Sequence, residues 1–317
     1  ISWGRNSDSV VRQNVAKVSF TDLHTAAILK NGSVMAGPVI TSGDAGDTTT
    51  VATALQVGVY EVVGNNKAFA ALKDMGTGVY EVVAWGNPTF GGNISQRHGS
   101  TSIPNIVSVA KSAGAFTAVS SDGDIYPWGA ENFGGKLNDD AINFLPISPP
   151  IKKVFAHPDG AAFVAVAEIQ TAGNRNVIAW GDENKGGNLT TVQSMLVDCR
   201  EDGIASNLGA FAAICGGDAR VVAWGSDRFG GKMTQCTNSH NYSQLCDPNR
   251  YLASHPDEAQ TSAVKIVQTE RAFASINTTG GVIAWGDENY GGDVRTVASQ
   301  LESSGITVRD LASSGSA

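Results

Sequence analysis

The sequence predicts an all-β chain built from repeats of about 45 residues. Three observations lead to this prediction. Two near-identical octapeptides, WGDENKGG at 180–187 and WGDENYGG at 285–292, lie 105 positions apart. All six tryptophans are followed by glycine, and five of them are preceded by a short apolar segment of the form AFAAL.

The Trp-Gly pairs mark the repeats. They lie at Trp3, Trp85, Trp128, Trp180, Trp224 and Trp285. The gap between the first two is about twice the repeat length, and a degenerate copy fills it. In this copy SVMAG at 33–37 replaces VVAWG, with Ala36 in the tryptophan position. Seven anchors result.

Two further features recur with each anchor. The AFAAL-type segments place a phenylalanine before each later tryptophan: Phe69, Phe116, Phe163, Phe211 and Phe273. The degenerate copy has HTAAI, with Thr25 in place of phenylalanine, so one Phe–Trp contact is lost from both sides. A Gly-Gly pair begins six residues after each of the later tryptophans, and Gly43 and Gly46 replace it in the degenerate copy.

The local sequence of each repeat predicts three strands. Segments such as RVVAWG and NVIAWG are β-branched and aromatic, which is typical of strands. AFAAL-type segments predict the adjoining buried strand, and turns such as CGGDA supply positive φ for a hairpin. A further strand is predicted before each pair: VAKVSF, IVSVAKS, IKKVFAH, AVKIVQT and ITVRDLA. We interpret the octapeptide as structural: tryptophan packs between sheets, and Gly-Gly redirects the chain.

A unit of this size cannot bury its apolar face alone, so neighbouring units must stack. Radial stacking predicts one β-propeller domain over residues 1–317. The chain opens with a last-strand motif, ISWG, and closes with an early-strand motif, ITVRDLASSGSA, which predicts closure by pairing of the N- and C-terminal segments. The middle strand of that blade is missing, so we expect either an incomplete last blade or one that further residues or a partner complete. Because the chain begins with Ile, we expect a processed form or part of a longer protein.

The pattern of VVAWG, a glycine-rich turn and a strand before AFAAL resembles the RCC1-like repeat over nearly the whole chain. That resemblance implies a seven-bladed β-propeller closed through its termini. The turn differs from the family's N-x-x-G-Q-L-G, and its Gly-x-x-His is matched only by Leu23-His24. Family members include a GTPase exchange factor that binds chromatin, a secreted β-lactamase inhibitor and scaffold arrays.

The charge of the chain disfavours some partners. The net charge is −8 and the pI is near 5.1. An acidic surface is unfavourable for nucleic acid, including chromatin, and for anionic lipid. No apolar run approaches the roughly 18–20 residues of a membrane-spanning helix, so no membrane insertion is expected.

No catalytic, cofactor or metal site is predicted. None of the five histidines has a second His or Cys at metal-ligand spacing, and no nucleophile or phosphate-binding motif occurs. The acidic turns with Asp44, Asp47, Asp122 and Asp124 lack the full oxygen set of a calcium loop. We therefore expect a chain that is not an enzyme.

The cysteines and sequons favour a secreted, cell-surface or organelle-lumenal protein over a cytoplasmic one. Candidate disulfides are Cys236–Cys246 and Cys199–Cys215, with four reduced thiols as the alternative. Candidate N-glycosylation sites are Asn31, Asn93, Asn188, Asn241 and Asn277.

The function expected from these features is a non-enzymatic scaffold that binds a protein partner through its loops. The insertion at 232–260 is the expected contact element, with His240, Tyr242, Arg250 and Tyr251 as candidates. The loop could equally be mobile and solvated. The alternatives are a structural subunit of a larger assembly or fibre, completed by neighbouring copies, and an enzyme with a site in the central channel.

Overall fold

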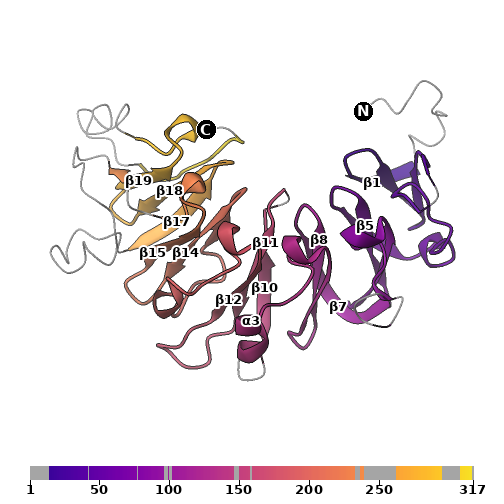
Figure 1. Ribbon diagram of the computed structural model, residues 1–317, viewed down its shortest axis with the longest axis horizontal. Helices are drawn as coiled ribbons and strands as arrows, with labels where there is room; N and C mark the ends of the chain where they lie inside the picture. The colour runs from indigo at the N-terminus through magenta and orange to yellow at the C-terminus, as the bar shows by residue number, and fades with distance from the viewer. Residues whose placement is uncertain are drawn as a thin grey trace. The chain divides into compact units, whose positions relative to one another are not determined.

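Antiparallel sheets form both units of this computed structural model, unit 1 (Ile1–Lys136) and unit 2 (Leu137–Ala317) (Figure 1). The structure describes residues 14–41, 43–76, 78–95, 99, 102–145, 150–157, 159–232, 236–238, 262–294 and 308–315. Over these residues the chain has the all-β character that the sequence predicts. None of the helices among them is long and apolar enough to cross a membrane.

Unit 1 contains a three-stranded and a six-stranded sheet. Its strands are β1 (Val15–Phe20), β2 (Thr25–Leu29), β3 (Val34–Gly37), β4 (Val59–Gly64), β5 (Ala68–Asp74), β6 (Tyr80–Gly86), β7 (Ser102–Lys111), β8 (Ala115–Ser120) and β9 (Ile125–Gly129). Its short 3-10 helices are η1 (Ala54–Gln56), η2 (Pro88–Phe90) and η3 (Glu131–Phe133). The first part of β7 pairs with β6 and the rest pairs with β8, so this strand joins two repeats into the larger sheet.

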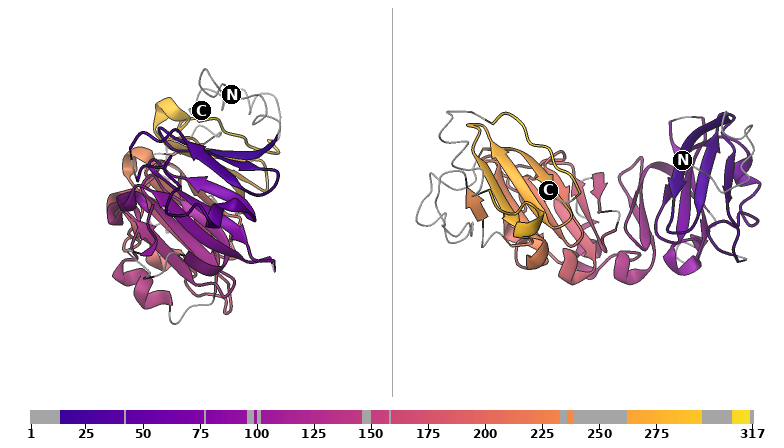
Figure 2. Two further views of the ribbon diagram at one scale, coloured as in Figure 1. Left: turned by 90° about the vertical axis from the view of Figure 1, so that its right-hand side faces the viewer. Right: turned by 90° about the horizontal axis from the view of Figure 1, so that it is seen from above.

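Unit 2 contains three sheets, in the orders β10-β11-β12, β13-β14-β15 and β16-β19-β18-β17. Its strands are β10 (Ile151–Phe155), β11 (Ala162–Ala167), β12 (Val177–Gly181), β13 (Ile204–Ser206), β14 (Ala210–Cys215), β15 (Arg220–Gly225), β16 (Cys236–Asn238), β17 (Ala263–Gln268), β18 (Ala272–Asn277) and β19 (Val282–Gly286). Its helical elements are α3 (Asp139–Phe144), η5 (Glu183–Lys185), η6 (Gln193–Met195), η7 (Asp227–Phe229) and η8 (Glu288–Tyr290). Figure 2 shows the strands of each sheet lying side by side.

The Phe–Trp contact predicted from the repeats is present in five repeats, two of which share the six-stranded sheet. Each phenylalanine of a middle strand pairs in register with the tryptophan of the next strand, as Phe69 does with Trp85. The rings stack with centroids 5.2 to 5.7 Å apart. All ten rings are among the most deeply buried side chains. The middle strands β8, β11 and β14 are buried along their whole length, which explains their small alanines.

Within each unit these aromatic pairs pack against the preceding sheet. Phe211 and Trp224, for example, lie against Val164 and Val177. Four indole Nε1 groups also donate hydrogen bonds of 2.9 to 3.1 Å to a carbonyl of the preceding repeat. These run from Trp85 to Ala45, Trp128 to Gly91, Trp224 to Gly186 and Trp285 to Gly230. The tryptophans therefore fix both the burial and the position of neighbouring sheets.

The polar residues of the octapeptide form the turn that follows each tryptophan. The side chains of Asp182 and Asp287 accept a hydrogen bond from the backbone N–H two residues on, at the start of η5 and η8. This is the capping role expected of aspartate at the start of a helical turn. The turn ends at a glycine with positive φ, such as Gly186 at 99°.

The degenerate repeat differs by one residue from the sequence-based assignment. Thr25 pairs with Gly37, whereas Ala36 pairs with Ala26. In a complete repeat, a Cβ on the second glycine of the Gly-Gly pair would overlap the carbonyl of the glycine that follows tryptophan. A Cβ on Gly46 would overlap the carbonyl of Pro38 in the same way, so Pro38 occupies the position of that glycine. Gly37, not Ala36, thus holds the tryptophan position. Similarly, Ala45 and Gly46, rather than Gly43 and Gly46, replace the Gly-Gly pair, because the indole of Trp85 donates to Ala45.

The C-terminal segment is not a strand over its described residues 308–315, contrary to the prediction for ITVRDLA. Val308 and Leu311 pack against the apolar cluster of Ile276 and Val282. The Lys265 Nζ donates to Asp310 Oδ1 at 2.6 Å and to the Leu311 carbonyl at 2.7 Å. A lysine side chain therefore satisfies a carbonyl that a neighbouring strand would otherwise bond.

Candidate functional site

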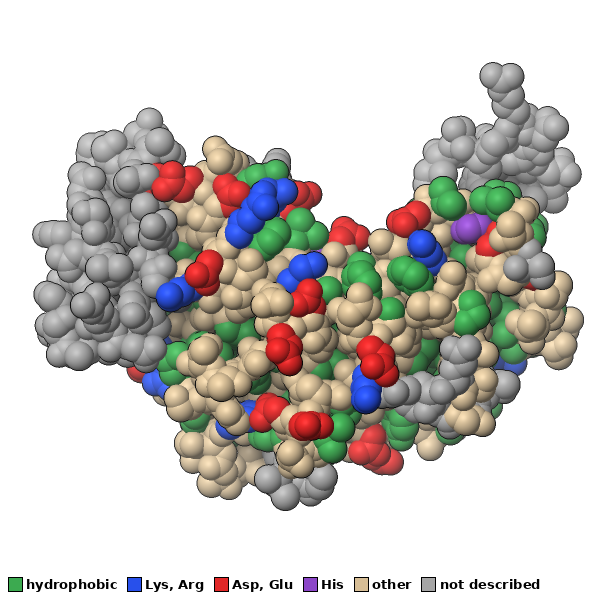
Figure 3. Space-filling model, in the orientation of Figure 1, with side chains coloured by type: hydrophobic (Ala, Val, Ile, Leu, Met, Phe, Trp, Pro, Cys, Tyr) green, Lys and Arg blue, Asp and Glu red, His purple; other side chains and the backbone are tan. Residues whose placement is uncertain are grey.

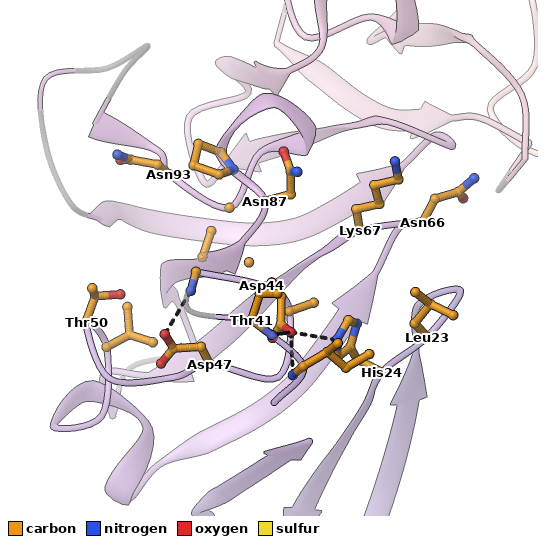
Figure 4. Close-up of a pocket in the computed structure, with 18 of the residues that line it drawn as sticks. Leu23, His24, Thr41, Asp44, Asp47, Thr50, Asn66, Lys67, Asn87 and Asn93 are labelled. Atoms are coloured by element: carbon orange, nitrogen blue, oxygen red, sulfur yellow. Dashed lines mark hydrogen bonds and ion pairs between the residues drawn. The ribbon is translucent and has the colours of Figure 1, made fainter. Parts of the chain in front are cut away.

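A cavity of about 840 Å³ lies in unit 1, where loops from several strands meet (Figure 4). The β1–β2 turn supplies Asp22 to His24, and the segment after β3 supplies residues between 40 and 51. The β4–β5 turn adds Asn66 and Lys67, and the turn after β6 adds residues between 86 and 95. The cavity thus lies beside the degenerate repeat, where Thr25 and Gly37 stand in place of the Phe–Trp pair.

Two aspartates fix the loop that follows β3. Asp44 Oδ2 accepts the backbone N–H groups of Ile40 and Thr41, both at 2.7 Å, and Oδ1 accepts that of Gly46 at 2.8 Å. Asp47 accepts the N–H and the hydroxyl of Thr49 and the N–H of Gly43. Because backbone donors take up these oxygens, both carboxylates hold the loop in shape. Among the described residues, no group of three or more His, Cys, Asp or Glu side chains could hold a metal.

His24 lies against Asp44 in the cavity wall. It is 8% exposed, and its Nε2 lies 3.3 Å from Asp44 Oδ2 without forming an aligned hydrogen bond. Burial by itself would raise the pKa of Asp44. The N–H groups of Thr41, Ile40 and Gly46, together with His24, outweigh this and hold that pKa below its usual value.

Thr21 completes a Thr–His–Asp line, since its Oγ1 lies 3.4 Å from His24 Nδ1. This line has the order of a nucleophile, a base and an orienting acid. However, the Thr21 hydroxyl also accepts the backbone N–H of His24 at 3.0 Å, which closes the β1–β2 turn. Both distances along the line exceed ordinary hydrogen-bond lengths for such a group.

The same turn recurs in other repeats, which identifies Thr21 as a structural cap. The side chains of Asn65, Ser112, Asn207 and Thr269 each accept the N–H of the alanine three residues on. Each of these four also donates to the carbonyl of the aromatic residue that ends the following 3-10 helix. Our reading of the sequence missed these caps, although a polar residue three positions before each alanine was the available signal.

Apolar side chains form the rim of the cavity. Leu23 is 70% exposed and Ile40 is 60% exposed, and both line it. Val39, next to Ile40, is 61% exposed. Lys67 adds a positive charge and places its Nζ 4.8 Å from the centre of the Phe90 ring. Hydrophobic side chains reach the surface elsewhere too (Figure 3), but here Leu23 and Ile40 line a cavity.

A smaller cavity of about 230 Å³ in unit 1 is lined by the acidic turn that the sequence singled out, with Asp122 and Asp124. Tyr126 also lines it. Burial raises the pKa of Tyr126, and the charges of Asp124 and Asp122 raise it further. No third acidic or metal-binding side chain joins this pair among the described residues.

The other sequence-predicted residues fall into two groups. The first group lies outside the described residues: His240, Asn241, Tyr242, Cys246, Arg250 and Tyr251. Cys236 is the first residue of strand β16. In unit 2, Cys199 and Cys215 form a disulfide. It joins the segment before β13 to the end of β14, next to Asn176, whose side chain bonds both the N–H and the carbonyl of Cys199.

No family model matches the chain, and no curated protein matches it. Among solved structures, human WBSCR16 is similar at 15% identity, over 86% of this chain and 76% of that one, with a TM-score of 0.43. Prp20p of Saccharomyces cerevisiae is similar at 13% identity over 86% and 72%, with a TM-score of 0.42, and is also described as yeast RCC1. The CRINKLY WD40 ectodomain of the Arabidopsis thaliana receptor kinase ACR4 is similar at 13% identity over 85% and 79%, with a TM-score of 0.40.

These similarities are distant. One of the similar proteins is yeast RCC1, and the repeat family that the sequence resembles is named after RCC1. The Prp20p structure is described together with binding to Gsp1p and histones, and yeast RCC1 with Kap60. The all-β assignment of this chain stands on its own strands and registers.

Proposed function

We propose that this chain is a non-enzymatic protein-binding β-propeller of RCC1-like repeats, and that a protein partner contacts the cavity rim of unit 1. The observation that carries the proposal is the exposure of Leu23 and Ile40, which line the cavity, and of Val39 next to Ile40 in the sequence. Isolated exposed apolar residues are common on protein surfaces, but a group of them beside a concave surface is typical of interaction sites.

The polar groups of the cavity support binding rather than catalysis. Asp44 and Asp47 hold the loop, and Thr21 caps a turn in the same way as its counterparts in other repeats. Asp22 and Lys67 remain as charged groups that a partner could meet at the cavity. Such charges at a rim favour selection of a partner more than affinity.

The proposal includes a single propeller of seven blades, closed by the N- and C-terminal segments. Six repeats contribute described sheets, three in each unit. Trp3 would provide the seventh anchor. Gly91, Gly186 and Gly230 are buried, and each accepts a hydrogen bond from the indole of the following repeat. The proposal gives Trp3 the same place beside Gly291.

A second candidate is a structural subunit of a larger assembly, in which neighbouring copies complete the last blade. It is favoured by the irregular backbone of residues 308–315, where a strand was predicted. The mass of the chain in solution separates the two candidates. A discrete monomer supports the protein-binding propeller, and a growing series of oligomers supports the subunit.

The location proposed for the chain is outside the cell or in an organelle lumen. The Cys199–Cys215 disulfide supports it, because such bonds persist in oxidising compartments. The partner is taken to be a protein, with no role for nucleic acid or membrane insertion.

Affinity capture from the native source tests the binding site. The bait is the full chain, compared with a Leu23→Asp, Ile40→Asp variant, in which two charges replace exposed apolar side chains. We expect the variant to lose about 30-fold or more in affinity for the captured protein, as hot-spot residues do. An Ile169→Asp variant, changed at an exposed apolar position of unit 2, serves as the control. Equal capture by all three baits would contradict the proposed site.

A further inference from the structure

The four sequons within the described residues share one local geometry. In each, the asparagine Oδ1 accepts both the backbone N–H and the hydroxyl of the residue two positions on. The N–H···O distances are 2.8 to 3.1 Å and the hydroxyl distances are 2.6 to 2.8 Å, for Asn31, Asn93, Asn188 and Asn277. The oxygen of each amide therefore faces its own turn, and the Nδ2 lies on the opposite side of the planar amide.

Three of these asparagines have room for a glycan on that nitrogen. Asn31, Asn93 and Asn188 are exposed. Asn93 and Asn188 occupy the same place in their repeats, directly after a Gly-Gly pair. The middle residue of each sequon, Ile94 or Leu189, is 2% or 3% exposed and fixes the turn to the core. A group attached to Nδ2 at these sites projects into solvent.

Asn277 differs both in its exposure and in the space around its Nδ2. It is half-buried at the end of β18, and its Oδ1 accepts a third hydrogen bond from the N–H of Gly281 at 2.7 Å. A Cβ on Gly281 would lie 3.0 Å from Asn277 Nδ2, so this nitrogen faces the backbone across the β18–β19 turn. A sugar on it would displace that backbone and break the hydrogen bonds of the turn.

A second feature points to the compartment in which glycans are added. Cys199 and Cys215 form a disulfide, a bond that forms and persists in oxidising compartments such as the secretory route. Sequons in a chain on that route meet the glycosylation machinery. The disulfide lies in unit 2 and the exposed sequons lie in both units, so the two observations are independent.

We infer that the chain carries N-linked oligosaccharides on Asn31, Asn93 and Asn188, and none on Asn277. The donor is an oligosaccharide carried on a lipid diphosphate. The asparagine Nδ2 forms a bond to the anomeric carbon, the bond from that carbon to the diphosphate oxygen breaks, and the lipid diphosphate leaves. The amide gives up one proton to a base of the transferase.

This inference does not depend on the proposed partner, but it affects the same region. Asn93 lines the cavity of unit 1 (Figure 4). A glycan there stands at the cavity wall, whereas those on Asn31 and Asn188 do not belong to the cavity lining. Glycosylation can therefore be measured by itself, whether or not a partner binds.

The test uses the full chain, directed into the secretory route of a eukaryotic host, with a further sequon in an added C-terminal tag. Enzymatic removal of the glycans in heavy-oxygen water turns each glycosylated asparagine into labelled aspartate, which peptide mass spectrometry locates. We expect label at positions 31, 93 and 188 and unmodified asparagine at 277. Label at 277, or no label at the three exposed sites while the tag is labelled, would overturn the inference.

Matched variants check the assignment on the intact chain. Asn188→Gln should remove the mass of one glycan, and Thr190→Ala should do the same because the sequon loses its hydroxyl. Asn277→Gln should leave the glycan mass unchanged. Loss of a glycan in the Asn277 variant would contradict the geometric argument.

Discussion

The carbonyl oxygen of a Trp-Gly glycine explains why Gly-Gly follows at a fixed distance. In all five complete copies, a Cβ on the second glycine of the pair would overlap the backbone of the Trp-Gly glycine. The first glycine meets a different neighbour: a Cβ on Gly186 would crowd the Phe211 ring of the next repeat. The second glycine thus permits the turn and excludes a side chain, whereas the first lets the next aromatic ring pack closely and is replaced by Ala45 in the degenerate copy.

Gly231→Ala tests this requirement in unit 2. Because the new methyl would overlap the Gly225 backbone, we expect the free energy of unfolding to fall by about 3 kcal/mol. Gly217→Ala is the control, since a Cβ there meets nothing within 4 Å. Chemical denaturation measures both. A Gly231→Ala chain as stable as the control would mean that the turn relaxes freely.

The carboxylate of Asp44 predicts how the stability of unit 1 depends on pH. Its pKa is below the usual value of 3.8 in the folded chain, so its contribution is present at higher pH and is lost as pH falls through the folded pKa. We expect acid denaturation curves of Asp44→Asn to be less steep below pH 3.8 than those of the natural chain. Equal steepness would show that the loop does not depend on this charge.

At the level of elements, the strands could be predicted because their sequence signals are local. Alanine and phenylalanine in AFAAL, and β-branched residues before Trp-Gly, mark their strands without reference to other repeats. Other features depend on contacts between distant residues. Five of the six first strands, β1, β4, β7, β10 and β17, share a bulge next to the first residue that pairs with the middle strand, and no residue type signals it.

The cavity is a further feature that the sequence did not reveal. It forms where Thr25 and Gly37 replace the aromatic pair, and where Asp44 and Asp47 fold a longer loop. Without a tryptophan to fix the alignment, Ala36 and Gly37 could not be distinguished from sequence. His24 was visible only as a lone histidine, and its neighbour Asp44 lies 20 residues further along the chain.

The disulfide that joins Cys199 to the last residue of β14 predicts a measurable contribution to stability. Cys199 and Cys215 are 16 residues apart, and closing a loop of that length stabilises a protein by about 3 kcal/mol. We expect a Cys199→Ala, Cys215→Ala chain to unfold at correspondingly lower denaturant concentration. After a reductant has broken the disulfide of the natural chain, that chain and the variant should have similar stability. A natural chain that is unaffected by reductant would contradict the stabilising role.

At the level of the whole molecule, the central question is whether Trp3 belongs to the repeat system. Within each unit, tryptophans such as Trp85 and Trp285 are buried between a sheet and its predecessor. The same Trp-Gly sequence occurs at Trp3, ahead of the first described strand β1. A closed propeller requires that its indole be buried like the others, against the last sheet.

Replacing Trp3 with alanine therefore tests closure. If Trp3 anchors the seventh blade, the variant should lose about 3 to 5 kcal/mol of unfolding free energy, as buried aromatic-to-alanine changes do. Trp285→Ala provides the scale, because that indole is fully buried and bonded to Gly230. Denaturant titration followed by tryptophan fluorescence and by circular dichroism compares the two. A Trp3→Ala chain as stable as the natural one would mean that the first residues lie outside the fold, and the seven-bladed closure would then be wrong.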